Sequence, residues 1–238
     1  RADDDRVQNW DSFVDNPELR LGQITGVAEE GMIQTDYPSI NLVSIPTEGH
    51  SLWEEVLTSR IDGTLMGSIS VPIYIELGNG NLKAVPEDCL SAPLFGSEWG
   101  NAVAESDPIL GFVEATIADL KDNGEWDELL EYWYQPEILR MGIDAPTGGT
   151  GMTSRPAGVP APGESAVVDR IYENGVLRGG CAPTPPHCMV DPDTNEWIGL
   201  GPETGKKLAE AMGVEYETVG VGWDAIVAGL PSGQFDVV

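Results

Sequence analysis

The chain has 238 residues, and 40 Asp and Glu against 12 Lys and Arg give it a formal net charge of −28. A charge of this sign and size repels phosphate backbones and anionic lipid heads, which argues against nucleic acids and membrane surfaces as partners. A hydrophobic fraction of 41% suffices for a sizeable core and argues against an intrinsically disordered chain. No stretch approaches the roughly 20 apolar residues of a membrane-spanning helix. Because like charges repel and seek water, the acidic runs at 3–5, 29–30 and 54–55 are predicted to be solvated surface.

Predicted strands and helices alternate in the part of the chain before residue 146. Short apolar runs bounded by turn residues predict strands at 19–24, 42–44 and 61–66. Apolar residues at helical spacing predict helices over 27–32, 52–57, 107–124 and 126–133, and a further element begins at 73–75.

Residues 146–164 differ from both flanks, because they lack apolar periodicity and are rich in Gly, Pro, Ser and Thr. This composition indicates a flexible linker. Met152 follows Gly-Gly-Thr-Gly and resembles a former start codon behind a synthetic joint. After the linker, strands are predicted at 176–178, 214–221 and 235–238, with helices at 201–213 and 223–233 between them. Strand, helix, strand, helix, strand is the order of a parallel sheet, so the predicted fold class is α/β.

Cys181 and Cys188 flank a proline-rich segment, and two interpretations of the pair stay open. The thiols either close a small disulfide ring, which requires an oxidising compartment, or are two ordinary buried thiols. His187 beside them does not complete a zinc site, because a second pair of ligands at zinc spacing is lacking. Adjacent residues rarely point at each other, so a catalytic Cys–His pair is not expected either. We expect no metal and no other cofactor.

Two sets of segments carry a resemblance to one known family. The first set is 168–178, 185–187, 196–200, 222–226 and 233–238, and the second is 22–28, 60–67 and 120–133. The first set resembles the opening third of the family 3 extracellular solute-binding proteins, the amino-acid-type receptors of ABC importers, and the second set resembles the remainder. The resemblance implies a two-lobed periplasmic-binding-protein fold of type 2, in which α/β lobes close on a ligand about a hinge. It also implies a monomer that docks on the permease of an ABC transporter.

The order of these segments is rotated relative to the family. Residues 1–84 correspond to lobe 2, residues 85–145 to the C-terminal part of lobe 1, and residues 165–238 to the N-terminal part of lobe 1. The linker at 146–164 then joins the family's old termini, which indicates a circular permutation and an engineered protein, such as a ligand sensor with a fused reporter. The family's hinge segment, with the Arg that grips a ligand carboxylate, is either removed by design or outside this sequence.

The resemblance places ligand contacts in both lobes. Thr184 precedes the Pro-Pro turn, His187 follows it, and Trp223 opens a helix where the family has an aromatic that covers the ligand. A satisfied loop histidine and a core tryptophan are the alternatives. In lobe 2 the family holds the ligand carboxylate with backbone N–H groups of a strand-to-helix turn, and Gly67 stands where it has an Asp for the α-ammonium. The residues carried over for that turn are Ile24, Gly26, Val27 and Ala28.

These positions depart from an amino-acid site. Val27 and Ala28 supply no hydroxyl to a ligand carboxylate, and Gly67 supplies no carboxylate to an ammonium. We therefore expect a larger, less polar or singly charged ligand, such as an amine or another cation, in place of an ordinary α-amino acid. The parent type is periplasmic or extracellular, whereas an engineered form is found wherever its expression host leaves it.

The alternative function is an enzyme like cyclohexadienyl dehydratase, which resembles the same family. Such an enzyme needs an acid/base carboxylate placed in the cleft. Gly67 removes the obvious candidate, so a binding protein is expected and not an enzyme.

Overall fold

The computed structural model describes residues 1–46, 52–87, 102–135, 158–191 and 193–238. The chain forms two compact units: unit 1 comprises 1–98 with 222–224, and unit 2 comprises 99–221 with 225–238. Most of the predicted linker at 146–164 lies outside the described residues. Across the part of the chain that is described, the α/β fold class is confirmed, and no helix is long and apolar enough to cross a membrane. The lobe boundaries at 84 and 145 stay predictions.

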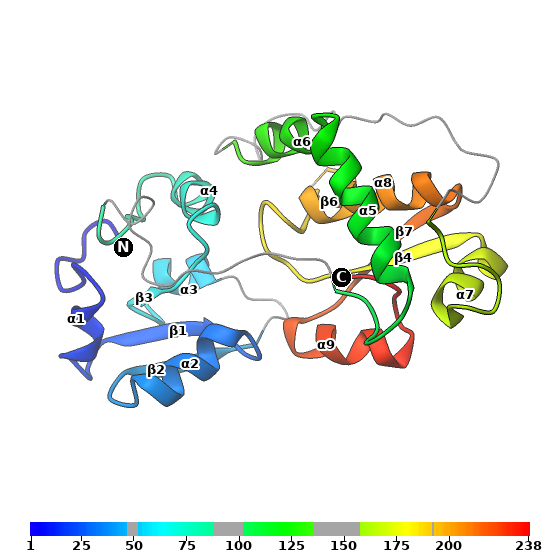
Figure 1. The fold of residues 1–238 in the computed structure, drawn as a ribbon. Helices are drawn as coiled ribbons and strands as arrows, with labels where there is room; N and C mark the ends of the chain where they lie inside the picture. Colours follow the sequence, from blue (N-terminus) through cyan, green and yellow to red (C-terminus); the bar gives the residue numbers. More distant parts are fainter. Residues whose placement is uncertain (47–51, 88–101, 136–157, 192) are drawn as a thin grey trace. The chain divides into compact units, whose positions relative to one another are not determined.

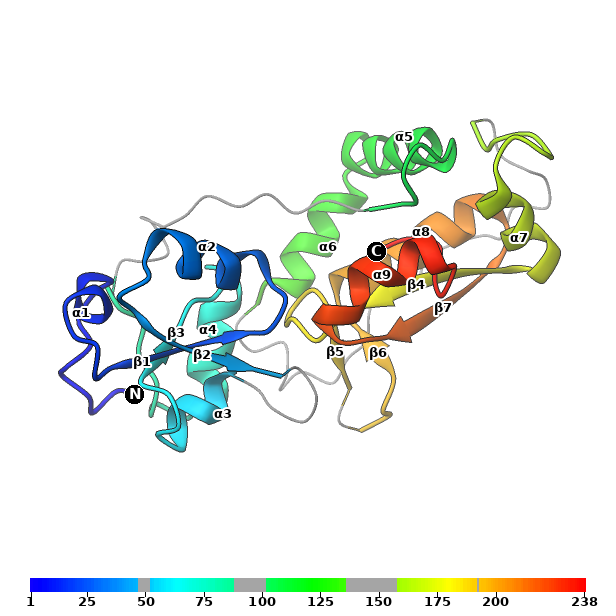
Figure 2. The same cartoon turned by 90° about the horizontal axis from the view of Figure 1, so that it is seen from below.

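Unit 1 is built on a three-stranded parallel sheet in the order β2-β1-β3 (Figure 1). The strands are β1 (Arg20–Ile24), β2 (Asn41–Ile45) and β3 (Gly63–Thr64), and the helices are α1 (Asp11–Val14), α2 (Ala28–Asp36), α3 (Leu52–Leu57) and α4 (Ser70–Leu77). Parallel strands need crossover connections, which α2 and α3 supply. These two helices lie on opposite faces of the sheet in both views of the ribbon (Figure 2).

Each face of this sheet has its own apolar cluster. Leu21 on β1 packs with Phe13 and Ile33 on the side of α2. Ile45 on β2 packs with Leu52 and Val56 of α3 on the other side. Successive side chains of a strand point to opposite faces, which explains how five-residue strands serve both clusters.

Unit 2 is built on two parallel strands, β4 (Val176–Cys181) and β7 (Glu215–Gly220), in register from Val176 opposite Glu215 to Cys181 opposite Gly220. A short antiparallel pair, β5 (Met189–Val190) and β6 (Trp197–Ile198), precedes the helix that starts at Leu200. The helices are α5 (Ile109–Asp122), α6 (Glu125–Trp133), α7 (Ala166–Asn174), α8 (Leu200–Met212) and α9 (Trp223–Ser232). Helix α8 ends where predicted, because Gly213 adopts φ +71°, which ends a helix at little steric cost.

Segments from both sides of the linker form one core in unit 2. Ile109 and Phe112 of α5 pack with Val168 of α7 and with Leu208 and Met212 of α8. Lys207 Nζ on α8 also pairs with Glu125 Oε2 on α6 at 2.6 Å. The described residues of 102–133, 158–221 and 225–238 therefore fold together although the linker separates them in sequence.

Two predicted strands are shorter than expected. In place of a strand at 235–238, Val237 alone bridges to Gly179 and to Val103. The N–H of Gly180 donates to the Val237 carbonyl, but the N–H of Arg178 donates to the Asp236 side chain and not to a backbone carbonyl of this segment. In place of a strand at 61–66, β3 covers two residues, after which the chain leaves the sheet toward α4.

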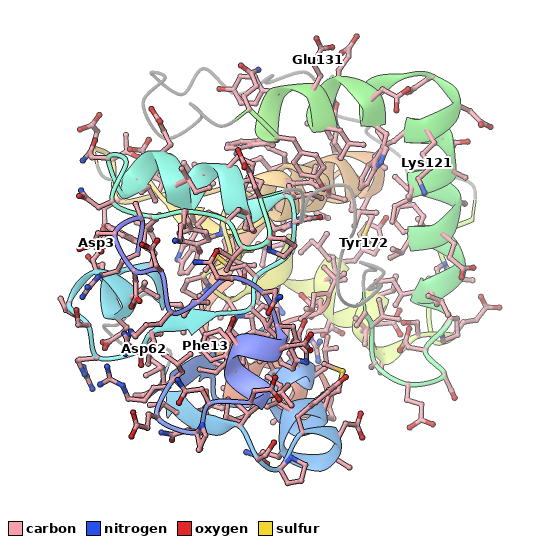
Figure 3. The ribbon with its side chains drawn as sticks, turned by 90° about the vertical axis from the view of Figure 1, so that its left-hand side faces the viewer. Asp3, Phe13, Asp62, Lys121, Glu131 and Tyr172 are labelled. Carbon is pink, nitrogen blue, oxygen red and sulfur yellow. A yellow bond between two sulfur atoms is a disulfide. The ribbon has the colours of Figure 1, made fainter. Side chains whose placement is uncertain are left out.

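The acidic runs are only partly solvated. Glu131 on α6, outside these runs, is exposed and projects outward (Figure 3). Asp4 and Glu55, however, are 8% and 4% exposed, which corrects the prediction for these two residues. Arg6 pairs with Asp4 at 2.6 Å and Arg60 pairs with Glu55 at 2.9 Å, so a neighbouring cation compensates each buried charge.

The first strand of each sheet is held near its start by the same Arg–Asp arrangement. In unit 1, the N–H and Nε of Arg20 donate to Asp62 Oδ2 at 2.8 and 3.0 Å. In unit 2, the N–H and Nε of Arg178 donate to Asp236 Oδ2 at 2.8 and 3.3 Å. Both aspartates are almost fully buried, and each returns its own N–H to the arginine carbonyl at 2.8 Å. The two units are thus anchored alike.

Candidate ligand-binding site

The predicted carboxylate turn lies at the carboxyl end of β1, where ligands commonly bind in parallel α/β sheets. Ile24 ends the strand, Gly26 adopts φ +89°, Val27 is extended, and α2 begins at Ala28. The positive φ of Gly26 lets the chain turn within three residues from strand to helix. The turn therefore has the predicted location.

A carboxylate of the protein itself occupies this turn. The N–H of Gly26 donates to Glu30 Oε2 at 2.8 Å, and the hydroxyl of Ser44 at the end of β2 donates to Glu30 Oε1. Glu30 is half-buried and bonded, so the prediction of a merely solvated Glu29-Glu30 run is wrong for Glu30. The position where the resemblance implies a ligand carboxylate is filled by this side chain.

Gly67 follows β3 by three residues and leaves open space. A Cβ placed on Gly67 meets no atom within 4 Å, and the Gly67 carbonyl accepts from the N–H of Ser70 at 2.9 Å as α4 begins. Gly67 thus contributes backbone and no charge at the carboxyl end of the sheet.

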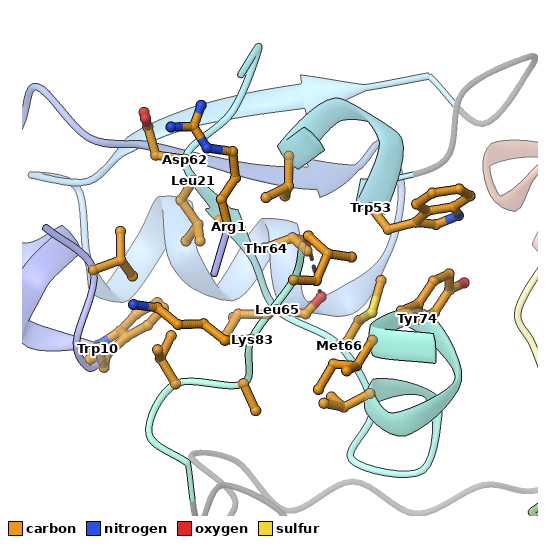
Figure 4. A pocket seen from close by; sticks show the side chains of 18 of the residues that line it. Arg1, Trp10, Leu21, Trp53, Asp62, Thr64, Leu65, Met66, Tyr74 and Lys83 are labelled. Carbon is orange, nitrogen blue, oxygen red and sulfur yellow. Dashed lines mark hydrogen bonds between the residues drawn. The ribbon is translucent and has the colours of Figure 1, made fainter. Parts of the chain in front are cut away.

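Gly67 also lines a pocket of about 360 Å³ that lies entirely within unit 1. Trp53, Met66 and Tyr74 gather at one end of it, and Trp10 and Lys83 at the other (Figure 4). Burial raises the pKa of Tyr74 to about 12, so its hydroxyl stays protonated at neutral pH. The residues predicted for the carboxylate turn, Ile24, Gly26, Val27 and Ala28, do not line this pocket.

In unit 2, Thr184 and His187 lie in a ring closed by a disulfide between Cys181 and Cys188, which settles the two open interpretations of these thiols. The Thr184 N–H donates to the Cys188 carbonyl at 2.7 Å, and the N–H groups of His187 and Cys188 donate to the Thr184 carbonyl at 2.8 and 2.9 Å. The ring begins at the last residue of β4, so it stands at the carboxyl end of that sheet.

The same ring caps α8. The N–H groups of Leu200 and Gly201 donate to the carbonyls of Pro186 and His187 at 3.2 and 2.8 Å. These are backbone donors at the first turn of a helix, which otherwise attract an anion. The start of α8 is consequently engaged by the protein itself.

His187 is a buried and neutral side chain. Burial lowers its pKa to about 4, and its ring meets Tyr134 edge-to-face with centroids 5.8 Å apart. At neutral pH the imidazole therefore carries no charge that could pair with a ligand.

Trp223 is half-buried and opens α9, as predicted. The structure thus groups the predicted residues into one turn in unit 1, one ring in unit 2, the separate Gly67 position, and Trp223. That they form a single site stays a prediction. No group of three or more His, Cys, Asp or Glu suited to a metal occurs among the described residues.

Sequence reasoning missed Glu30, Trp53 and Tyr74. Glu30 had a signal, because it follows Gly26 by four residues and can reach back over one helical turn. Trp53 and Tyr74 are on helices whose facing sides only the folded chain brings together.

The comparisons with known proteins each match about a quarter to a third of the chain. Residues 177–238 match the family described as "Bacterial extracellular solute-binding proteins, family 3". A solved "Ancestral Cationic Amino Acid Solute Binding Protein (AncCDT-1)" is 34% identical over 30% of this chain and 31% of its own, with a TM-score of 0.28. An ancestral cyclohexadienyl dehydratase, AncCDT-3, is 33% identical over 29% of this chain and 28% of its own, with a TM-score of 0.27. The chain thus spans less than a third of either protein. No curated protein matches it.

Proposed function

We propose that this chain, whose residues 177–238 match family 3 of the bacterial extracellular solute-binding proteins, binds a small organic solute as its lobes close about a hinge. It acts as the receptor of an ABC importer, docking on the permease, or as a sensor scaffold derived from one. Both α/β units place predicted ligand contacts at the carboxyl ends of parallel strands, which supports the binding of a ligand.

The ligand we propose is an amine or another cation, and not an ordinary α-amino acid. The observation that carries this is the Glu30 carboxylate bonded to the Gly26 N–H, because a second carboxylate at that turn meets both an occupied donor and a like charge. An ammonium group instead gains from Glu30. The face of Trp223 can add a cation–π contact of about 0.5–2 kcal/mol.

Calorimetric titration of the full chain tests this proposal. The panel contains the common α-amino acids and small amines such as benzylamine and 1,4-diaminobutane. We expect binding of at least one amine, together with a decrease in the radius of gyration by solution scattering as the lobes close. A folded protein that binds no member of the panel would overturn the proposal.

We further propose that the chain is a circular permutation of the family order. The shared core of residues 102–133, 158–221 and 225–238 supports it, because it places segments from both sides of the linker in one unit. Moving residues 1–145 behind residue 238, with the linker deleted and a flexible joint inserted, should preserve the circular-dichroism spectrum and thermal unfolding of both units. Loss of unit 2 folding in the reordered chain would contradict the permutation.

A further inference from the structure

We infer that the pocket of unit 1 binds an uncharged, ring-sized apolar group of the ligand, against a wall formed by Trp53, Met66 and Tyr74. The inference rests on the proposed function and deepens it, because it names the part of the solute that unit 1 receives. The predicted turn at Gly26 and the pocket are separate places in the same unit.

The size of the pocket suits such a group. Its volume is about 360 Å³. An apolar cavity of about 150 Å³ already takes benzene, and sites for small organic ligands begin at about 300 Å³. The pocket therefore has room for an aromatic ring with a short substituent.

The wall of the pocket is aromatic and polarisable. Trp53 comes from α3, Met66 from the segment after β3, and Tyr74 from α4, and their side chains gather at one end (Figure 4). Tryptophan and tyrosine faces favour offset or edge contacts with another ring, and methionine sulfur contacts aromatic rings favourably. The protonated Tyr74 hydroxyl can also donate a hydrogen bond to an oxygen of the ligand.

The charges in the lining do not favour a carboxylate. Arg1 pairs with Asp3 at 3.0 Å, Asp62 with Arg20 at 3.0 Å, and Lys83 with Asp5 at 3.7 Å. The remaining charged side chain of the described lining is Glu29, which repels an anion. The lining therefore disfavours an anionic group, and the uncharged part of the ligand is the occupant that suits its aromatic wall.

Gly67 is a suitable position for a substitution that fills the pocket. It lines the pocket, it has open space at its Cβ position, and its φ is not in the left-handed region, so a larger side chain fits without backbone strain. Gly31 on α2 is a matched control, because it is likewise exposed with open space at Cβ in unit 1 but lies outside the pocket lining.

The probe is benzyl alcohol, titrated into the full chain by calorimetry. We expect saturable binding by the wild type, at least tenfold weaker binding by Gly67→Leu, and wild-type affinity in Gly31→Leu. Tyr74→Ala is a second variant that removes part of the wall, and it should also weaken binding at least tenfold. Circular dichroism of each variant checks that it folds. No saturable binding by the wild type, or wild-type affinity in both folded pocket variants, overturns the inference.

A further variant separates this inference from the proposed function. Trp223→Ala should weaken the binding of an amine solute and leave benzyl alcohol binding unchanged. Amine binding without benzyl alcohol binding overturns the pocket and keeps the proposed function. Benzyl alcohol binding that Gly67→Leu weakens, without binding of any solute of the panel, keeps the pocket and overturns the proposed function.

Discussion

The first strands of the two units begin alike and end differently. Arg20 with Asp62 and Arg178 with Asp236 hold the strand starts in nearly the same geometry. At the far end, β1 turns within three residues into α2, whereas β4 leads into a disulfide ring and the β5–β6 pair before α8. The shared Arg–Asp anchor therefore stabilises both sheets in the same way. The two units differ in the connection that follows the first strand.

Because of this difference, different kinds of group bond to the start of the helix that follows each strand. In unit 1 a side chain, Glu30, engages the turn before α2, and a side chain can move or be replaced. In unit 2 the backbone carbonyls of Pro186 and His187 cap α8, and the disulfide holds them in place. We expect ligand preference to respond to changes in unit 1 and stability to respond to changes in unit 2.

The largest effect should come from the anchor of unit 2. Asp236→Ala leaves Arg170 and Arg178 without the buried carboxylate that they share, and breaking a buried pair costs about 3–5 kcal/mol. Asp62→Ala should cost less, because its partners Arg6 and Arg20 are 55% and 38% exposed against 33% and 24% for Arg170 and Arg178. Urea unfolding measures both, with the exposed Asp119→Ala as control. Equal losses in all three variants would break the comparison.

The pH dependence should differ between the units. The pKa of His187 is lowered by burial to about 4, so the unfolded chain takes up a proton below about pH 6.5 while the folded chain does not. The contribution of His187 to the free energy of unfolding should therefore fall by about 2–4 kcal/mol as the pH drops from 6.5 to 4, and this contribution should not change further below pH 4. In His187→Phe, the urea midpoint should change less between pH 6.5 and pH 4 than it does in the wild type. An unchanged profile in that variant would remove His187 as the cause.

Unit 1 should respond at lower pH. Burial alone would raise the pKa of Asp62, but hydrogen bonds from Arg20 and Arg6 outweigh it and hold the pKa below its usual value. A carboxylate with a lowered pKa contributes stability above its unfolded-state value, near 4, and loses it as the pH falls through the folded-state value. In urea unfolding, the difference in the free energy of unfolding between Asp62→Ala and the wild type should therefore disappear only in strong acid.

Opening the ring should destabilise unit 2 by about 2–3 kcal/mol, because cross-linking residues only seven positions apart restricts the unfolded chain modestly. In urea unfolding, the double variant Cys181→Ser with Cys188→Ser should have the same free energy of unfolding as the wild type whose disulfide has been reduced with dithiothreitol. It should also expose the start of α8, seen as faster amide exchange at Leu200 and Gly201. Unchanged exchange there would contradict a capping role for the ring.

The smallest effect concerns ligand preference at Gly67. Gly67→Asp adds a carboxylate in open space at the carboxyl end of the sheet of unit 1, and a charge-assisted hydrogen bond adds about 1.5–3 kcal/mol. Amine affinity should rise by about tenfold or more in calorimetry. Gly67→Asn is the control without the charge, and an equal gain in both variants would mean that charge is not the cause.

Local signals predicted most of the elements. The helical spacing before Gly213 predicted α8, and the turn at Gly26 predicted the end of β1, since both depend on residues close in sequence. The strand expected at 235–238 was wrong, because pairing depends on what lies beside the chain. The anchors were hidden for the same reason: Arg20 and Arg178 meet aspartates 42 and 58 residues away.

The site was less predictable than the fold. A glutamate that bonds back to a turn and one that faces water have the same local pattern, so Glu30 looked like surface. The pocket needs side chains from α3, α4 and the segment after β3, and no single stretch of sequence contains them.

Because Glu30 fills the turn at which the resemblance implies a ligand carboxylate, its charge should decide between amines and α-amino acids. Calorimetry of the wild type and of Glu30→Gln, each titrated with benzylamine and with L-alanine, tests it most directly, with Glu18→Gln as a control for the loss of one surface charge. The wild type should bind the amine and not alanine. Only Glu30→Gln should lose amine affinity, by about tenfold, and show measurable alanine binding. Tight alanine binding by the wild type that Glu30→Gln leaves unchanged would contradict this prediction.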